Sequence, residues 1–177
     1  PVPLPHQTAA LPYTTYDSDC PMQTLVANHR TAFIPCPLPQ KDERFKTNSN
    51  EAHLCASLVA AIIKLYEDNK LPYDAQHTIG IIAPFRNQGA LIRQALATLG
   101  LDEQTRHISI DTVERYQGSQ RDIIIYCTTV TTPAQMELIV EATMCSTSPE
   151  APYSLDRKLN VALTRARQQL FVIGIPH

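Results

Sequence analysis

The sequence predicts a doubly wound α/β fold, with a mainly parallel sheet and helices on both of its faces. Short apolar runs at 78–83, 122–129 and 171–173 suit strands that are buried on both sides. Apolar residues at helical spacing separate these runs, and the connections are long enough for crossovers. We therefore expect at least four parallel strands. In such sheets ligands bind beyond the carboxyl ends of the strands.

The first 40 residues differ in composition from the rest of the chain. Eight of the fourteen prolines and none of the five glycines fall there. Proline removes a backbone donor and disfavours helix before it, so this stretch is expected to be extended, with one strand near 31–34. The composition predicts an extended leader or inter-domain segment at 1–40 and one domain at 41–177.

Two helices and a strand are predicted next. Asn48 and Glu51 resemble a capping box, and apolar positions continue one helical face to about Asn69. The apolar run 78–83 is closed by a proline. Asn87 is a candidate cap for the second helix, which a glycine at position 100 ends.

The remaining elements are read from the second half of the chain. The run 107–112 alternates as a strand, and the polar stretch VERYQGSQR forms a loop before the strand at 122–129. Residues 130–153 read as an insertion with a short helix at 134–142. The final helix is expected to begin after Ser154 and to include both Arg165 and Arg167, which then point about 200° apart.

Composition limits the classes of function. A net charge of −2 excludes a broadly basic surface, so any nucleic-acid contact must be local. No apolar run approaches the roughly 20 residues of a membrane span, and the start lacks the pattern of a signal peptide. Five irregularly spaced cysteines predict a reduced, intracellular and cytoplasmic setting without a metal site.

Three sequence blocks carry a resemblance to a known family. TIGIIAPFRNQ, IDTVERYQGSQRDIII and LNVALTRAR, in this order, resemble motifs IV, V and VI of superfamily 1 helicases, in the group that includes the nonsense-mediated-decay helicase. The resemblance covers about residues 78–177 and is weaker from 48 onward. It implies a RecA-like domain of the P-loop NTPase type, the second of two motor domains.

The resemblance also implies a cofactor and partners. ATP and Mg²⁺ would be held mainly by a first RecA-like domain, because GxxxxGK[ST] does not occur in these 177 residues. The implied partners are that first domain and single-stranded DNA or RNA, with no membrane. Alone, the domain is expected to be inactive.

Arginines carry the catalytic part of the resemblance. Arg165 in TRAR looks like the arginine finger, and Arg86 resembles a motif IV arginine that also reaches the γ-phosphate, although some relatives place theirs at the position of Gly89. From spacing alone, both arginines also fit solvated helix ends. Arg167 either contacts the nucleotide or pairs with a carboxylate such as Asp122, and we favour the pairing.

The second block carries the contacts with nucleic acid. Thr112 matches a residue that holds a backbone phosphate, and Gln117 would couple the nucleic acid to the nucleotide. Gly118 would permit close backbone approach to the nucleotide, although QG in a loop also fits an ordinary turn. Gln120 replaces the glutamate that the family usually places against the ribose, and it keeps hydrogen-bonding capacity.

Three hypotheses follow. The first is the C-terminal motor domain of an ATP-dependent helicase or translocase. The second is a RecA-like module without a motor partner that binds nucleic acid or protein, for which two intact arginines have no use. The third, an unrelated domain that binds a mononucleotide by itself, lacks the glycine-rich first turn of such domains.

Overall fold

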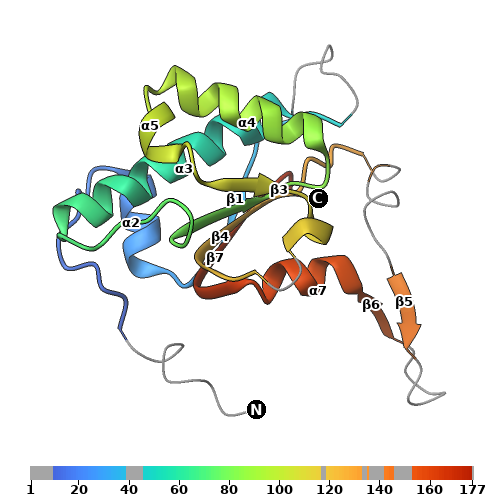
Figure 1. Ribbon diagram of the computed structural model, residues 1–177. Helices are drawn as coiled ribbons and strands as arrows, with labels where there is room; N and C mark the ends of the chain where they lie inside the picture. The colour runs from blue at the N-terminus through green and yellow to red at the C-terminus, as the bar shows by residue number, and fades with distance from the viewer. Residues whose placement is uncertain are drawn as a thin grey trace.

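The sheet has five strands, all parallel, in the order β1-β7-β4-β2-β3. In this computed structural model residues 10–38, 46–116, 119–132, 135, 142–145 and 153–176 are described, with only the backbone at 142–145 and 153–159. Helices α3 and α4 lie on one face of the sheet, and α7 lies on the other (Figure 1). The predicted fold class is confirmed. The elements are α2 (Pro21–Asn28), β1 (Thr31–Pro35), α3 (Ser49–Asp68), β2 (Ile79–Ile82), α4 (Arg86–Thr98), α5 (Asp102–Thr105), β3 (Ser109–Asp111), the 3₁₀-helix η1 (Val113–Tyr116), β4 (Arg121–Cys127), β5 (Ala142–Cys145), β6 (Tyr153–Asp156), α7 (Arg157–Leu163) and β7 (Ala166–Gly174).

Alternate residues of the central strand β4 enter two different hydrophobic cores. Ile123 and Ile125 pack in the core that includes α3 and α4. Ile124 and Tyr126 pack in the core that includes η1 and α7. Successive side chains of a strand point to opposite faces, so a strand covered on both faces is apolar throughout. This burial explains the unbroken apolar run in the sequence.

Helix α3 begins where the sequence predicts. The Asn48 side chain accepts a hydrogen bond from the backbone N–H of Glu51, which satisfies one of the free donors of the first turn. The Asn48 N–H itself is bound by Gln88 rather than by Glu51, so the capping box is only half formed. In the part of the chain that the structure describes, no helix is both long and apolar enough to cross a membrane.

Helix α4 begins two residues earlier than a cap at Asn87 would allow. Phe85 occupies the N-cap position without a side-chain bond, so Arg86 is the first helical residue and Asn87 the second. The helix is followed by Gly100, whose φ of 70° is the left-handed conformation that glycine adopts at low cost.

The described part of the first 40 residues contributes to the sheet and to its core. The predicted strand near 31–34 is confirmed as β1, which pairs with β7 at one edge. Pro21–Asn28 form a helix instead of extended chain, with Pro21 in the first turn, where its missing N–H has no cost. Val26 packs in the same core as α3. The predicted boundary near residue 40 lies within 39–45, outside the described residues, and the division stays a prediction.

The last helix is shorter than its sequence pattern predicts. Helix α7 ends at Leu163, Thr164 and Arg165 form a turn, and Arg167 already belongs to β7. Ser154 lies in β6, which pairs antiparallel with β5, so it does not cap the helix. Most of the predicted helix at 134–142 lies outside the described residues.

Candidate functional site

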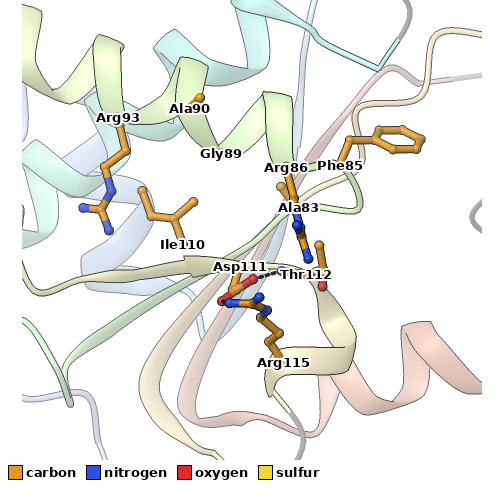
Figure 2. Close-up of a pocket in the computed structure, with 10 residues that line it drawn as sticks. All are labelled: Ala83, Phe85, Arg86, Gly89, Ala90, Arg93, Ile110, Asp111, Thr112 and Arg115. Atoms are coloured by element: carbon orange, nitrogen blue, oxygen red, sulfur yellow. Dashed lines mark hydrogen bonds and ion pairs between the residues drawn. The ribbon is translucent and has the colours of Figure 1, made fainter.

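A pocket of about 330 Å³ opens at the carboxyl edge of the sheet (Figure 2). Three segments form it: the chain that follows β2, the first turns of α4, and the end of β3 with the start of η1. It combines three arginines with one aspartate, so it is locally positive in a chain of net charge −2. The lining residues are Ala83, Phe85, Arg86, Gly89, Ala90, Arg93, Ile110, Asp111, Thr112 and Arg115.

Arg86 and Thr112, predicted separately from the sequence, lie in this one pocket. Arg86 is exposed, and its side chain points from α4 toward Thr112. Among the described residues no hydrogen bond or ion pair holds its guanidinium. The first turn of α4 carries no acidic residue, so the positive end of the helix dipole is also uncompensated there. A helix N-terminus, a guanidinium and a hydroxyl together favour an oxyanion such as phosphate.

Two further arginines complete the pocket in different ways. Arg115 forms an ion pair with Asp111 at 3.6 Å, and Asp111 also accepts a hydrogen bond from the Thr112 N–H at 3.0 Å. Because Arg115 is 62% exposed, the pair is weak and the guanidinium remains accessible to a ligand. Arg93 donates to the backbone oxygens of Thr105 and Ile108 and so braces the wall of the pocket. Burial lowers the pKa of Arg93.

Arg165 lies at the opposite, amino edge of the sheet, in the turn between α7 and β7. Its Nε donates to the Val161 carbonyl at 3.1 Å, and its Nη2 donates to the Thr164 hydroxyl at 3.2 Å. These bonds are those of an arginine at a helix C-terminus. They use two of the five N–H donors of the side chain.

Gln120 is close to Arg165 at this edge. The backbone N–H of Arg121, the next residue, donates to the Arg165 carbonyl at 3.0 Å. The Arg121 guanidinium carbon lies 5.8 Å from the centre of the Tyr116 ring, and its Nη1 donates to the Gln120 carbonyl. Arg121 Nε is buried without a hydrogen-bond partner among the described residues. The start of β4 and the start of β7 thus gather positive charge.

Arg167 pairs with Asp122 across β7 and β4. Their charged atoms are 3.8 Å apart, which is the pairing that the sequence analysis favoured over nucleotide contact. Burial raises the pKa of the Asp122 carboxyl, and the nearby Arg167 charge partly offsets that rise. The Arg167 side chain is 49% exposed, so the pair is a modest brace between neighbouring strands.

The predicted residues therefore fall into two groups. Arg86 and Thr112 lie together at the carboxyl edge, whereas Gln120 and Arg165 lie together at the amino edge. Strand β4 separates the two edges, and its seven residues span roughly 20 Å. The structure does not bring Arg86 and Arg165 together. Gln117 and Gly118 lie outside the described residues, and their predicted roles stay predictions.

Arg115 in the first group and Arg121 in the second were not predicted from the sequence. Each follows a predicted site residue closely: Arg115 is three residues after Thr112, and Arg121 is next to Gln120. A one-turn spacing on a short helix was the available signal for Arg115. For Arg121, the signal was a basic residue at the start of an otherwise apolar strand.

Comparisons with known proteins identify a domain family and several helicases as relatives. A family model described as an AAA domain matches residues 12–177. A probable helicase of Dictyostelium discoideum is 32% identical over 72% of this chain, which corresponds to 11% of that protein. The human DNA replication ATP-dependent helicase/nuclease DNA2 is 30% identical over 80% of the chain and 11% of its own length, and helicase SEN1 of Saccharomyces cerevisiae is 29% identical over 72% and 5%. The chain thus spans about a tenth or less of these relatives.

Proposed function

The chain belongs to the AAA domain family, which occurs in superfamily 1 helicases, and we propose that it is the second, C-terminal RecA-like motor domain of such an enzyme. In this proposal the three blocks that contain Arg86, Thr112 and Arg165 are motifs IV, V and VI of the nonsense-mediated-decay group. The enzyme would hydrolyse ATP to move along single-stranded DNA or RNA.

The observation that carries the proposal is the separation of two positive groups to opposite edges of one sheet. A motor that couples ATP hydrolysis to movement needs a phosphate contact for the nucleotide and another for the polymer. Arg165 with Gln120 supports the first, and Arg86 with Thr112 supports the second. We therefore assign Arg165 as the arginine finger and move Arg86 from the γ-phosphate to the nucleic acid.

The residues of the amino edge fit the phosphate end of a nucleotide better than its metal ion. Arg121 and Arg165 supply guanidinium groups that match phosphate geometry. The neighbouring carboxylate, Asp122, is engaged with Arg167 at 3.8 Å and has a raised pKa. Mg²⁺ and most of ATP would be held by the first RecA-like domain, and the arginine would neutralise charge that develops on the transferred phosphoryl group.

The function is tested by ATP hydrolysis in the longest natural form of this protein, with and without single-stranded DNA and single-stranded RNA. Strong stimulation of ATP hydrolysis by either polymer supports the motor function and identifies the polymer. The isolated domain is expected not to hydrolyse ATP. A folded full-length protein without hydrolysis under any condition would favour the interaction module without a motor.

Arg86→Ala is expected to weaken binding of a single-stranded oligonucleotide by about tenfold, because one charge-assisted phosphate contact is lost. The salt slope of the binding constant should also fall by about one, since one counterion fewer is released. Fluorescence anisotropy of a labelled strand at several salt concentrations measures both quantities. Arg106→Ala removes an exposed arginine from the amino edge and is the control. Equal losses in the two variants would contradict the assignment.

Thr112→Ala is expected to reduce the stimulation of ATP hydrolysis by nucleic acid more than it reduces basal hydrolysis. The hydroxyl lies in the pocket at the carboxyl edge, away from the edge that holds Arg165. Thr98→Ala, on the exposed side of α4, provides a matched control. If basal and stimulated rates fell by the same factor, Thr112 would have no special role with nucleic acid.

A further inference from the structure

Gln88 fixes the start of α4 through two hydrogen bonds to the backbone of a single residue, Asn48. Its Oε1 accepts from the Asn48 N–H at 2.7 Å, and its Nε2 donates to the Asn48 carbonyl at 2.9 Å. Both residues are completely buried. The amide thereby fastens the first turn of α4 to the N-cap residue of α3.

The same junction continues to the carboxyl end of β4. The Asn48 side chain donates to Glu51, and the buried Glu51 carboxylate accepts from the Thr129 N–H at 2.8 and 3.1 Å. Thr129 has a φ of 56°, a conformation that is costly for a non-glycine residue and persists only where its surroundings fix it. The network therefore links the starts of α3 and α4 to the end of β4.

This junction lies at the carboxyl end of β4, one of the two strands between which the strand order reverses. From β2 the chain crosses to β3 on one side, and from β4 it crosses to β7 on the other. In open α/β sheets the crevice at the carboxyl ends of two such strands is the usual ligand site. Here Asn48 and Glu51 place buried polar side chains beside the β4 end of that crevice. The pocket described above lies at the ends of β2 and β3.

Gln88 and Arg86 lie on opposite sides of one helical turn. They are two residues apart, so their side chains point about 200° from each other around the axis. Gln88 points into the junction, where it bonds to Asn48. Arg86 points toward Thr112 in the pocket (Figure 2). Gly89, which follows Gln88, lines the same pocket. A shift of this turn would move the guanidinium and the helix N-terminus together.

We propose that Gln88 is a positioning residue for the pocket that contains Arg86 and Thr112, because its two hydrogen bonds to Asn48 set the angle at which α4 presents Arg86 to a ligand. The inference rests on the proposed function of that pocket. If the inference holds, loss of Gln88 weakens ligand binding, whereas loss of a glutamine that only stabilises the fold lowers stability alone.

The chain offers such a glutamine as a control. Gln169 is also buried, and it makes three hydrogen bonds: it accepts from the Tyr13 hydroxyl at 2.8 Å and donates to the Val26 and His29 carbonyls, each at 2.7 Å. It lies in β7 and ties that strand to α2, without contact with the pocket. Methionine has a similar volume and cannot form these hydrogen bonds. Gln88→Met and Gln169→Met therefore each remove the hydrogen bonds of one buried glutamine and change the packing little.

The test is a double-mutant cycle in the longest natural form of the protein. Binding of a labelled single-stranded oligonucleotide is measured for Gln88→Met, Arg86→Ala, the double variant and Gln169→Met, together with the melting temperature of each. We expect Gln88→Met to weaken binding by about fivefold and the double variant to bind no more than about twofold worse than Arg86→Ala, since contacting residues of one unit are not additive. Gln169→Met should lower the melting temperature while the Kd stays within about twofold.

The inference is overturned if Gln88→Met leaves the Kd unchanged, or if its effect multiplies with that of Arg86→Ala. In either case an effect of Arg86→Ala alone would keep the proposed function. If neither Arg86→Ala nor Thr112→Ala changes the Kd for the oligonucleotide, the proposed function of the pocket is contradicted as well. Gln88→Asn, which keeps the amide on a shorter stem, is the milder variant if Gln88→Met does not fold. It should show a smaller loss of binding with the same coupling to Arg86.

Discussion

Arg165→Ala in the longest natural form of this protein is expected to lower ATP turnover by roughly 10³-fold, while ATP affinity changes only a few-fold. The loss follows from the role of an arginine finger, which is worth about 10³ to 10⁵ in related phosphoryl transfer. Its charge acts mainly on negative charge that develops in the transition state, so the ground-state complex depends on it much less.

A structural role for Arg165 predicts a different outcome. Its bonds to Val161 and Thr164 at the end of α7 are local and partly exposed, and their loss would cost about 1 kcal/mol of stability without a selective effect on turnover. Single-turnover hydrolysis and nucleotide binding, measured on the same preparations, separate the two. Arg106→Ala is the matched control for an exposed arginine at this edge. Turnover of Arg165→Ala within about twofold of the unmodified protein would remove the assignment.

The fold was predictable where local and tertiary preferences agree. The apolar runs of β2 and β4 have few alternatives to a strand buried on both faces, and Asn48 with the periodic residues behind it marks α3. The end of α7 was not predictable in this way. Ala166 fits the apolar face of a helix, but pairing between β7 and β4 extends the strand back to it. Sheet pairing overrides helical spacing there.

The candidate site was predictable residue by residue, but not as a set. Arg86, Thr112, Gln120 and Arg165 each stand out by motif. Which of them are neighbours depends on the strand order, and the order is set by contacts between segments far apart in the sequence. In our proposal Arg86 is therefore assigned to the nucleic acid, because it lies beside Thr112 and away from Arg165. Gln88 belongs to the same block, and the role that we propose for it depends on the buried junction.

Glu51→Ala is expected to cost about 3 kcal/mol in local stability, the largest structural effect that we predict for a single side chain. Removal of the carboxylate leaves the buried Thr129 N–H without the two oxygens that bind it, and a conformation with φ of 56° loses its main restraint. Hydrogen bonds to a charged group contribute about 1.5 to 3 kcal/mol, and an unsatisfied buried donor adds a further cost.

Amide hydrogen exchange in the longest natural form of the protein measures this loss of local stability peptide by peptide. About 3 kcal/mol corresponds to roughly 100-fold faster exchange in the peptide that spans β4 and Thr129, provided that exchange follows the open population. Glu67→Ala removes an exposed glutamate from the same helix and should change exchange by less than about threefold. Because Glu51 and Gln88 meet at Asn48, the Glu51 variant should also loosen the first turn of α4. Acceleration confined to β4, with α4 as protected as before, would show that the junction does not transmit position to the pocket.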